Sequence, residues 1–134
     1  MSTSEIAHEL EKLYQSCTKE TLLDIESKTQ DGVRIVKLRG RLCMGAPLDQ
    51  FNATMAELLN QPQPKIILDL SDVATIDSSA IGMLVRCLTT AKKAGGSIRL
   101  LNPTKFTLQT LKMVGLLNLF ATYEDLSQAI ASFQ

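Results

Sequence analysis

The segment Lys65–Leu70, with the sequence KIILDL, is a nearly continuous apolar run. Such a run is typical of a β-strand that is buried on both faces, because a strand with one face in water alternates apolar and polar residues. We therefore expect residues 65–70 to form a central strand. Since helices must cover both faces of such a strand, the run favours an α/β fold.

Two other β-favouring runs, residues 22–27 and 33–38, precede this strand. The connection between them contains Asp31-Gly32, which are residue types that adopt positive φ in a tight hairpin turn. We expect an antiparallel pair here. Gly40 is expected to end the second strand, and residues 40–47 are expected to form the loop into the first helix.

Four later segments repeat apolar residues at the spacing of a helix. Their apolar positions are Leu48, Phe51, Met55, Leu58 and Leu59; Ile81, Leu84, Val85 and Leu88; Leu108, Leu111 and Val114; and Leu126, Ile130 and Phe133. Further strands are expected at residues 97–101 and 119–123. This alternation predicts a mixed sheet of four to five strands with about four core helices.

Residues 1–20 are predicted to be a helical extension ahead of a domain that spans residues 21–134. The apolar residues Ile6, Leu10, Leu13 and Cys17 share one face of an amphipathic helix within this extension. Such a helix can pad the core or a sheet edge. It can also bind a partner or a second copy of the chain, so that a homodimer through this helix stays open as an alternative.

Charge and hydropathy exclude several classes of function. The 134 residues carry 14 basic and 14 acidic side chains, with no basic cluster longer than Lys92-Lys93, so we expect no direct contact with nucleic acid. The apolar runs are too short to span a bilayer, and the N-terminus lacks the apolar core of a secretory signal. We expect a cytoplasmic protein without membrane insertion.

Cysteine and histidine positions argue against metal and nucleophilic chemistry. Cys17, Cys43 and Cys87 are widely spaced and form no C-x-x-C pair, so neither a disulfide framework nor a zinc site is indicated. Cys87 is expected to be a small packing residue rather than a redox group. Because His8 is the single histidine and lies in the predicted extension, a catalytic triad of the Ser-His type is not expected. We expect no catalytic residue, cofactor or metal.

An acid and two hydroxyls, Asp77-Ser78-Ser79, stand directly before the second helical segment. Asp or Ser at such a place can accept hydrogen bonds from the first N–H groups of the helix, which contributes about 1 kcal/mol. A cap explains one of the three residues. The same helix start favours a phosphate, and phosphorylation of Ser78 would add about −1.5 to −2 charges beside Asp77. A plain cap and a phosphorylation switch both remain open at this point.

The stretch DSSAIG, residues 77–82, resembles the D-S-S/T-G-L/I-G signature of STAS domains, in particular of anti-sigma factor antagonists. The resemblance extends to KIILDLSDVATID before it, to GMLVRCLTTAKKAGGSIRLLN and LKMVGLLNLF after it, and to VRIVKLRGRL further upstream. It covers about residues 20–133. It implies a STAS-like fold for this chain and a role as a kinase substrate, not as an enzyme.

The resemblance also implies which residues act. In that family, the cognate anti-sigma factor, a serine kinase, phosphorylates a serine or threonine of this turn, and the unphosphorylated antagonist binds the kinase so that the sigma factor is released. Ser78 would be the acceptor, with Ser79 as the alternative, and a serine phosphatase would be a further partner. Asp77 and Ser79 are expected to shape and cap the turn. The implied partner-binding residues are Asp77, Ser78, Ser79, Gly82, Cys43 and Met44.

Two residues depart from the family pattern. Ala80 replaces the common glycine of the signature, which removes backbone freedom, and Cys43 stands where the resemblance leads us to expect an acidic residue. A second hypothesis therefore stays open, namely a STAS module that senses a small ligand or scaffolds a transport or signalling complex without phosphorylation. Nucleotide binding is a third, although no G-x-x-x-x-G-K-[ST] loop is present.

Overall fold

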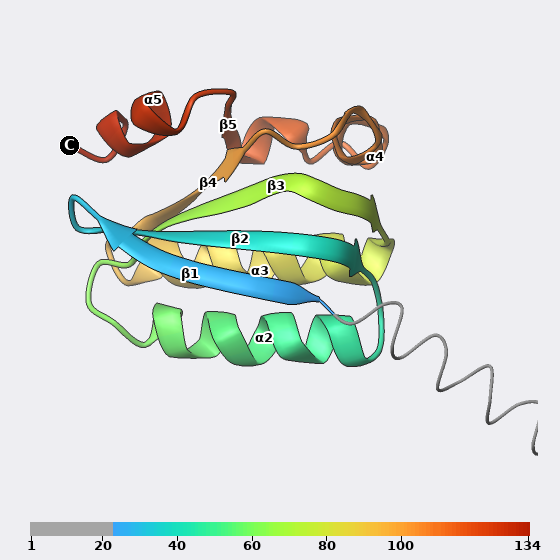
Figure 1. Ribbon diagram of the computed structural model, residues 1–134, viewed down its shortest axis with the longest axis horizontal. Helices are drawn as coiled ribbons and strands as arrows, with labels where there is room; N and C mark the ends of the chain where they lie inside the picture. The colour runs from blue at the N-terminus through green and yellow to red at the C-terminus, as the bar shows by residue number, and fades with distance from the viewer. Residues whose placement is uncertain (1–22) are drawn as a thin grey trace, which may run out of the picture.

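The computed structural model describes residues 23–134, which form one five-stranded sheet with helices on both of its faces (Figure 1). The elements are β1 (Asp24–Gln30), β2 (Val33–Leu42), α2 (Ala46–Leu59), β3 (Lys65–Ile76), α3 (Ser78–Lys93), β4 (Ser97–Leu101), α4 (Lys105–Met113), the 3-10 helix η1 (Leu117–Leu119), β5 (Ala121–Tyr123) and α5 (Leu126–Ala131). The predicted α/β class is confirmed. The predicted extension of residues 1–20 and its amphipathic helix lie outside the described residues.

The sheet has the strand order β1-β2-β3-β4-β5. β1 is antiparallel to β2, whereas the pairs β2–β3, β3–β4 and β4–β5 are parallel, so the sheet is mixed as predicted. β3 lies in the centre, which confirms the prediction for residues 65–70. The strand continues to Ile76 and so delivers the chain directly to Asp77.

The β1–β2 hairpin turns at Asp31 and Gly32, as the sequence predicts. Both residues have positive φ, 54° at Asp31 and 78° at Gly32, which is the conformation of a type I′ turn. Gln30 lies opposite Val33, and the pairing continues without a register shift to Asp24 opposite Arg39. β1 runs three residues further than expected because its pairing with β2 reaches the turn itself, whereas the extra length of β2 lies at its far end, where it pairs with β3.

The prediction that Gly40 ends β2 is wrong. The strand continues through Arg41 to Leu42, and its pairing with β3 shifts register between Gly40 and Arg41. Gly40 has a φ of 117°, which only glycine adopts without strain, so the residue bends the strand instead of ending it. The loop into α2 is therefore residues 43–45, and not the whole of residues 40–47.

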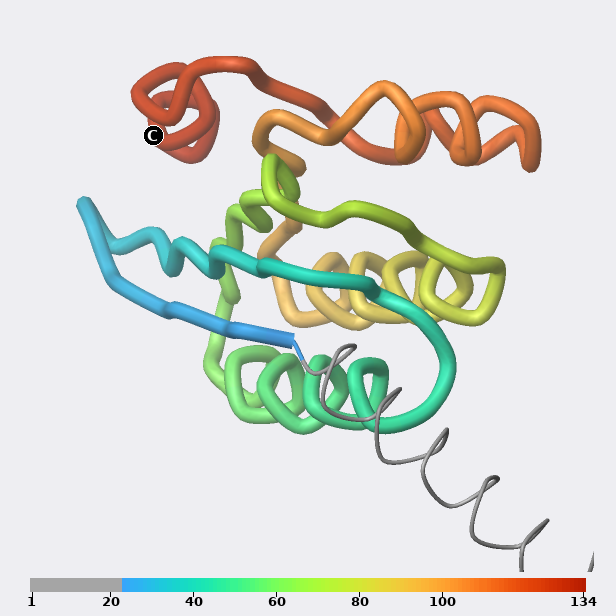
Figure 2. Tube along the Cα trace, turned by 45° about the vertical axis from the view of Figure 1, so that its right-hand side comes forward, coloured from blue at the N-terminus to red at the C-terminus, as the bar shows by residue number. Residues whose placement is uncertain are grey.

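Each face of the sheet has its own apolar cluster, because successive strand residues point to opposite faces. α2 and α3 lie side by side against one face (Figure 2) and bury Phe51, Met55, Leu84 and Leu88 on a set of strand residues that includes Val36, Leu38, Ile66 and Leu68. α4 adds Leu111 to this larger cluster. On the other face, Ala129 and Ile130 of α5 cover Val33, Ile35, Ile67 and Leu101.

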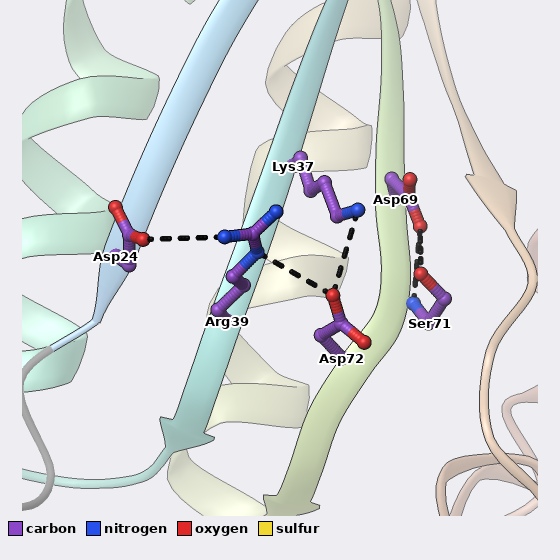
Figure 3. Close-up of polar contacts among 6 residues, drawn as sticks. All are labelled: Asp24, Lys37, Arg39, Asp69, Ser71 and Asp72. Carbon is purple, nitrogen blue, oxygen red and sulfur yellow. Dashed lines mark hydrogen bonds and ion pairs between the residues drawn. The ribbon is translucent and has the colours of Figure 1, made fainter.

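The rest of that second face is charged. Asp72 Oδ2 lies 3.5 Å from Lys37 Nζ and 3.4 Å from Arg39 Nε, and Arg39 also reaches Asp24 at 3.8 Å (Figure 3). These side chains lie in front of the sheet in Figure 3, with helices behind it, and they are one-third to two-thirds exposed. Ion pairs this exposed contribute at most about 1 kcal/mol each, so they mark the solvated part of this face, beside the apolar cluster under α5.

Candidate functional site at the start of helix α3

The candidate site lies where β2 and β3 end and the chain turns into α2 and α3 (Figure 1). Leu42 and Ile76 are the last paired residues of the two parallel strands, so the two turns leave the sheet side by side. The main-chain N–H of Asp77 donates to the carbonyl oxygen of Leu42 over 3.3 Å. The carboxyl ends of parallel strands are where α/β proteins place their functional loops.

Asp77 ties these two turns together with one carboxylate. It is the N-cap of α3, and its Oδ1 accepts a hydrogen bond from the N–H of Ala80 at 2.9 Å. Its other oxygen, Oδ2, accepts a hydrogen bond at 2.8 Å from the N–H of Met44, a residue of the turn before α2. The predicted capping role of Asp77 is confirmed, and the carboxylate also fixes the neighbouring turn.

The two hydroxyls that follow differ in exposure. Ser78 is the first residue of α3 and is exposed, whereas Ser79 is half-buried. Within residues 23–134, neither side chain takes part in capping the helix. Ser79 already lies inside the helix, where it cannot stand in the N-cap position, so the cap that the sequence assigned jointly to Asp77 and Ser79 belongs to Asp77 alone.

The helix start can accept an anion at Ser78. The N–H groups of Ser78 and Ser79 precede the first intrahelical hydrogen bond, which Ile81 donates to the carbonyl of Asp77 at 3.0 Å. These N–H groups and the positive end of the helix dipole favour negative charge. The carboxylate of Asp77 works against it, but both of its oxygens already accept N–H groups.

The remaining predicted partner-binding residues surround this turn. Met44 is 70% exposed and Cys43 is half-buried, both in the turn that Asp77 holds. Gly82 is exposed one helical turn beyond Ser78, and hence on the same side of α3. The structure thus gathers all six predicted residues at one end of the sheet. The contact between Asp77 and the main chain of Met44 had no signal in the sequence.

Ala80 fits the helix without strain. It is fully buried in the larger apolar cluster, and it occupies the third position of α3, where its N–H is capped by Asp77. The backbone here is helical, with no positive φ that would require glycine. Alanine stabilises a helix by about 1 kcal/mol relative to glycine, so this departure from the family signature stabilises the first turn of α3.

The other chemistry-bearing residues lie apart from this site. Burial in α3 raises the pKa of the Cys87 thiol from 9.0 to about 11, which makes the side chain a poor nucleophile, in agreement with the predicted packing role. Residues 23–134 contain no cluster of three His, Cys, Asp or Glu side chains suited to a metal ion. In the same residues, no helix combines the length and the apolar character that a membrane span needs.

Several solved structures share the fold. A candidate anti-sigma factor antagonist of Thermotoga maritima is 28% identical, with a TM-score of 0.75 over 81% of this chain and 93% of that chain. The anti-sigma factor antagonist SpoIIAA in its unphosphorylated form is 20% identical, with a TM-score of 0.66 over 82% and 94%. The murine anion transporter Slc26a9 is 17% identical, with a TM-score of 0.75 over 92% of this chain but 24% of the transporter.

Sequence comparison gives the family directly. A candidate anti-sigma factor antagonist of Thermotoga neapolitana is 33% identical over 78 residues, which are 58% of this chain and 69% of the relative. The sequence model of the STAS domain matches residues 24–129, from the first residue of β1 into α5. The chain belongs to the STAS domain family.

Proposed function

We propose that this protein is a cytoplasmic anti-sigma factor antagonist that binds a serine kinase of the anti-sigma type and is switched off by phosphorylation of Ser78. The observation that carries the proposal is the exposed Ser78 hydroxyl at the first position of α3, beside a turn whose other exposed group is the apolar side chain of Met44. The names of the relatives in the two Thermotoga species support the same reading.

The local physics fits a switch that leaves the fold intact. A phosphate on Ser78 would add about −1.5 to −2 charges at a helix N-terminus, where N–H groups and the dipole offset part of that charge. Asp77 would be a close like charge, yet its carboxylate is held by Met44 and Ala80. At an interface the same phosphate would have to be desolvated beside the apolar Met44, which opposes binding.

Exposure favours Ser78 over Ser79 as the acceptor. A kinase must place the hydroxyl in line with the γ-phosphate of ATP, and the exposed Ser78 allows this without opening the helix. Ser79 is half-buried and would have to leave its place in the first turn. In the proposed cycle the protein is a substrate and performs no catalysis, and a serine phosphatase restores the binding form.

The first test is phosphorylation itself. The chain is incubated with ATP and the serine kinase encoded nearest to it in its genome, and the modified site is mapped by mass spectrometry. We expect one phosphate on Ser78 and none in the Ser78→Ala variant. Phosphate on Ser79 alone would show that Ser79 is the acceptor in place of Ser78. A chain that takes up no phosphate would contradict the proposed switch.

The second test compares binding of the kinase to two serine variants. Ser78→Asp is expected to bind at least about 100-fold more weakly than wild type, because it adds a charge at the interface. Ser127→Asp is the matched control, since Ser127 is an exposed serine just behind the N-cap Asp125 of α5. Equal affinity of Ser78→Asp and Ser127→Asp would refute the proposed switch.

A second candidate function is a scaffold or ligand-sensing module of a transport or signalling complex. The match to the anion transporter Slc26a9 is the observation that favours it, although it shows a shared fold and no more. This alternative predicts that Ser78 stays unmodified in the presence of the kinase and ATP. It also predicts that Ser78→Ala and Ser78→Asp bind the partner equally well.

A further inference from the structure

The free edge of the sheet at β1 is long and exposed. Among residues 23–134, β1 is the outermost strand, with β2 on one side (Figure 1), and residues 26–30 are all exposed. An edge strand presents a row of unpaired N–H and C=O groups that can pair with another strand. The opposite edge, β5, spans only Ala121–Tyr123. The β1 edge is therefore the stronger candidate for strand addition.

The hairpin turn decides which residues of β1 point their main-chain groups outward. In a type I′ turn the N–H of Val33 donates to the carbonyl of Gln30, so that pair is hydrogen-bonded. Hydrogen-bonded and non-hydrogen-bonded pairs alternate along an antiparallel ladder. Because the register has no shift, the N–H and C=O groups of Ile25, Ser27 and Thr29 point to the open edge.

We propose that two copies of this chain associate by antiparallel pairing of their β1 strands about a two-fold axis at Ser27. This register places Ser27 opposite Ser27 of the second copy, and Ile25 opposite Thr29, so the outward-facing residues meet in about six main-chain hydrogen bonds. It also places Glu26 directly opposite Lys28 of the second copy, twice over. Within residues 23–134, neither Glu26 nor Lys28 has an ion-pair partner.

Other registers with the correct hydrogen-bonding parity are disfavoured by charge. An axis at Ile25 would place Glu26 opposite Asp24 of the second copy, and two carboxylates directly opposite each other repel. An axis at Thr29 would place Lys28 opposite Gln30 and Glu26 opposite Gly32, so that both ion pairs are lost. An axis at Glu26 would place Glu26 opposite itself, and an axis at Lys28 would place Lys28 opposite itself, so like charges meet in both registers. Of these registers, the sequence of β1, DIESKTQ, is complementary to itself only about Ser27.

The side chains at the junction suit such a contact. Glu26 and Lys28 lie on the charged face, where they line a hollow of about 390 Å³ together with Ile35, Lys37 and Asp69. On the other face the junction would carry Ser27 and Thr29, which are small enough to meet across the axis. The assembly would also stop at a dimer, because a two-fold contact occupies the β1 edge of both copies.

The arrangement leaves the Ser78 turn free. In an antiparallel β1 pair, the end of the sheet that carries Ser78 in one copy lies at the opposite end from that of the second copy. The inference is independent of phosphorylation, since neither Ser78 nor Met44 takes part in the pairing. It differs from the predicted homodimer through the amphipathic helix within residues 1–20, which would use another segment.

Sedimentation equilibrium of the full chain tests the proposal with charge variants. Lys28→Glu turns both ion pairs into carboxylate pairs, and Glu26→Lys turns both into ammonium pairs. Each variant alone is expected to dimerise at least about tenfold more weakly than wild type. In a mixture of the two variants, the two carboxylates of one chain lie opposite the two ammonium groups of the other. Both ion pairs are thereby restored, so a heterodimer of wild-type strength is expected.

The outcomes separate this contact from others. Far-UV circular dichroism confirms that each variant is folded, and the recovery in the mixture excludes misfolding as the cause of a lost dimer. A wild-type chain that stays monomeric at about 1 mM overturns the proposal. A dimer that is unchanged in both single variants also overturns it, because the contact then lies elsewhere on the chain.

Discussion

At the scale of the residue, Asp77 carries the candidate site. One carboxylate accepts the N–H of Ala80 in α3 and the N–H of Met44 in the turn before α2. A hydrogen bond to a charged group contributes about 1.5 to 3 kcal/mol, more than a neutral one. A single side chain therefore positions both exposed residues, Ser78 and Met44, and links the two turns that carry them.

Replacement of Asp77 by alanine should cost more than the loss of an ordinary cap. We expect Asp77→Ala to lower the free energy of unfolding by about 2 to 4 kcal/mol, because both N–H groups lose their acceptor. Asp125→Ala is the matched control, since Asp125 caps α5 and, among residues 23–134, its side chain accepts a hydrogen bond from Ser127 alone. That variant should cost about 1 kcal/mol. Urea denaturation measures both, and equal costs would argue against the second role of Asp77.

Sequence reasoning reached one half of this residue's role. A carboxylate directly before a helical segment predicts an N-cap, because that rule depends on neighbours along the chain. The bond from Met44 depends on two strands that end side by side, with Leu42 and Ile76 as their last pair. Long-range register of this kind has no local signal, so the joint between the two turns could not be predicted.

At the scale of the element, α3 is held by a buried stripe that includes a thiol. Ile81, Leu84, Cys87, Leu88 and Ala91 are all buried, at the helical spacing that the sequence shows. The helices were predictable because this periodicity is local. The continuation of β2 past Gly40 was not, because a glycine in a strand can either end it or bend it, and pairing with β3 decided the outcome.

The thiol of Cys87 gives α3 a testable pH dependence. Burial raises the folded-state pKa from 9.0 to about 11, so the fold favours the protonated thiol. This contribution to stability is complete below pH 9 and is lost as the pH rises towards about 11. The free energy of unfolding of wild type should therefore fall relative to Cys87→Ala between pH 8 and about 10.5. A difference in free energy of unfolding between wild type and Cys87→Ala that stays constant with pH would contradict a raised pKa of the buried thiol.

At the scale of the whole molecule, the sheet joins two cores of unequal size. In β3, Ile66 and Leu68 face the cluster under α2 and α3, whereas Ile67 between them faces α5. The smaller cluster is closed by a helix of six residues, Leu126–Ala131, which could not persist alone. Sequence periodicity predicted α5 but not the face it covers, because strand order is set by pairings distant along the chain.

Since both clusters share the same strands, the described chain should unfold as one unit. Ile130→Ala removes a buried side chain from the smaller cluster and should lower the free energy of unfolding by about 2 to 4 kcal/mol. Leu84→Ala, in the larger cluster, should lower it by as much or more.

Two spectroscopic probes test whether the unfolding is concerted. The protein has no tryptophan and two tyrosines, Tyr14 and Tyr123, so in a Tyr14→Phe background the fluorescence of Tyr123 reports on the smaller cluster. Far-UV circular dichroism reports on all helices together. Coincident urea transitions by both probes, in wild type and in Ile130→Ala, are expected, whereas an earlier Tyr123 transition would show that α5 detaches before the sheet unfolds.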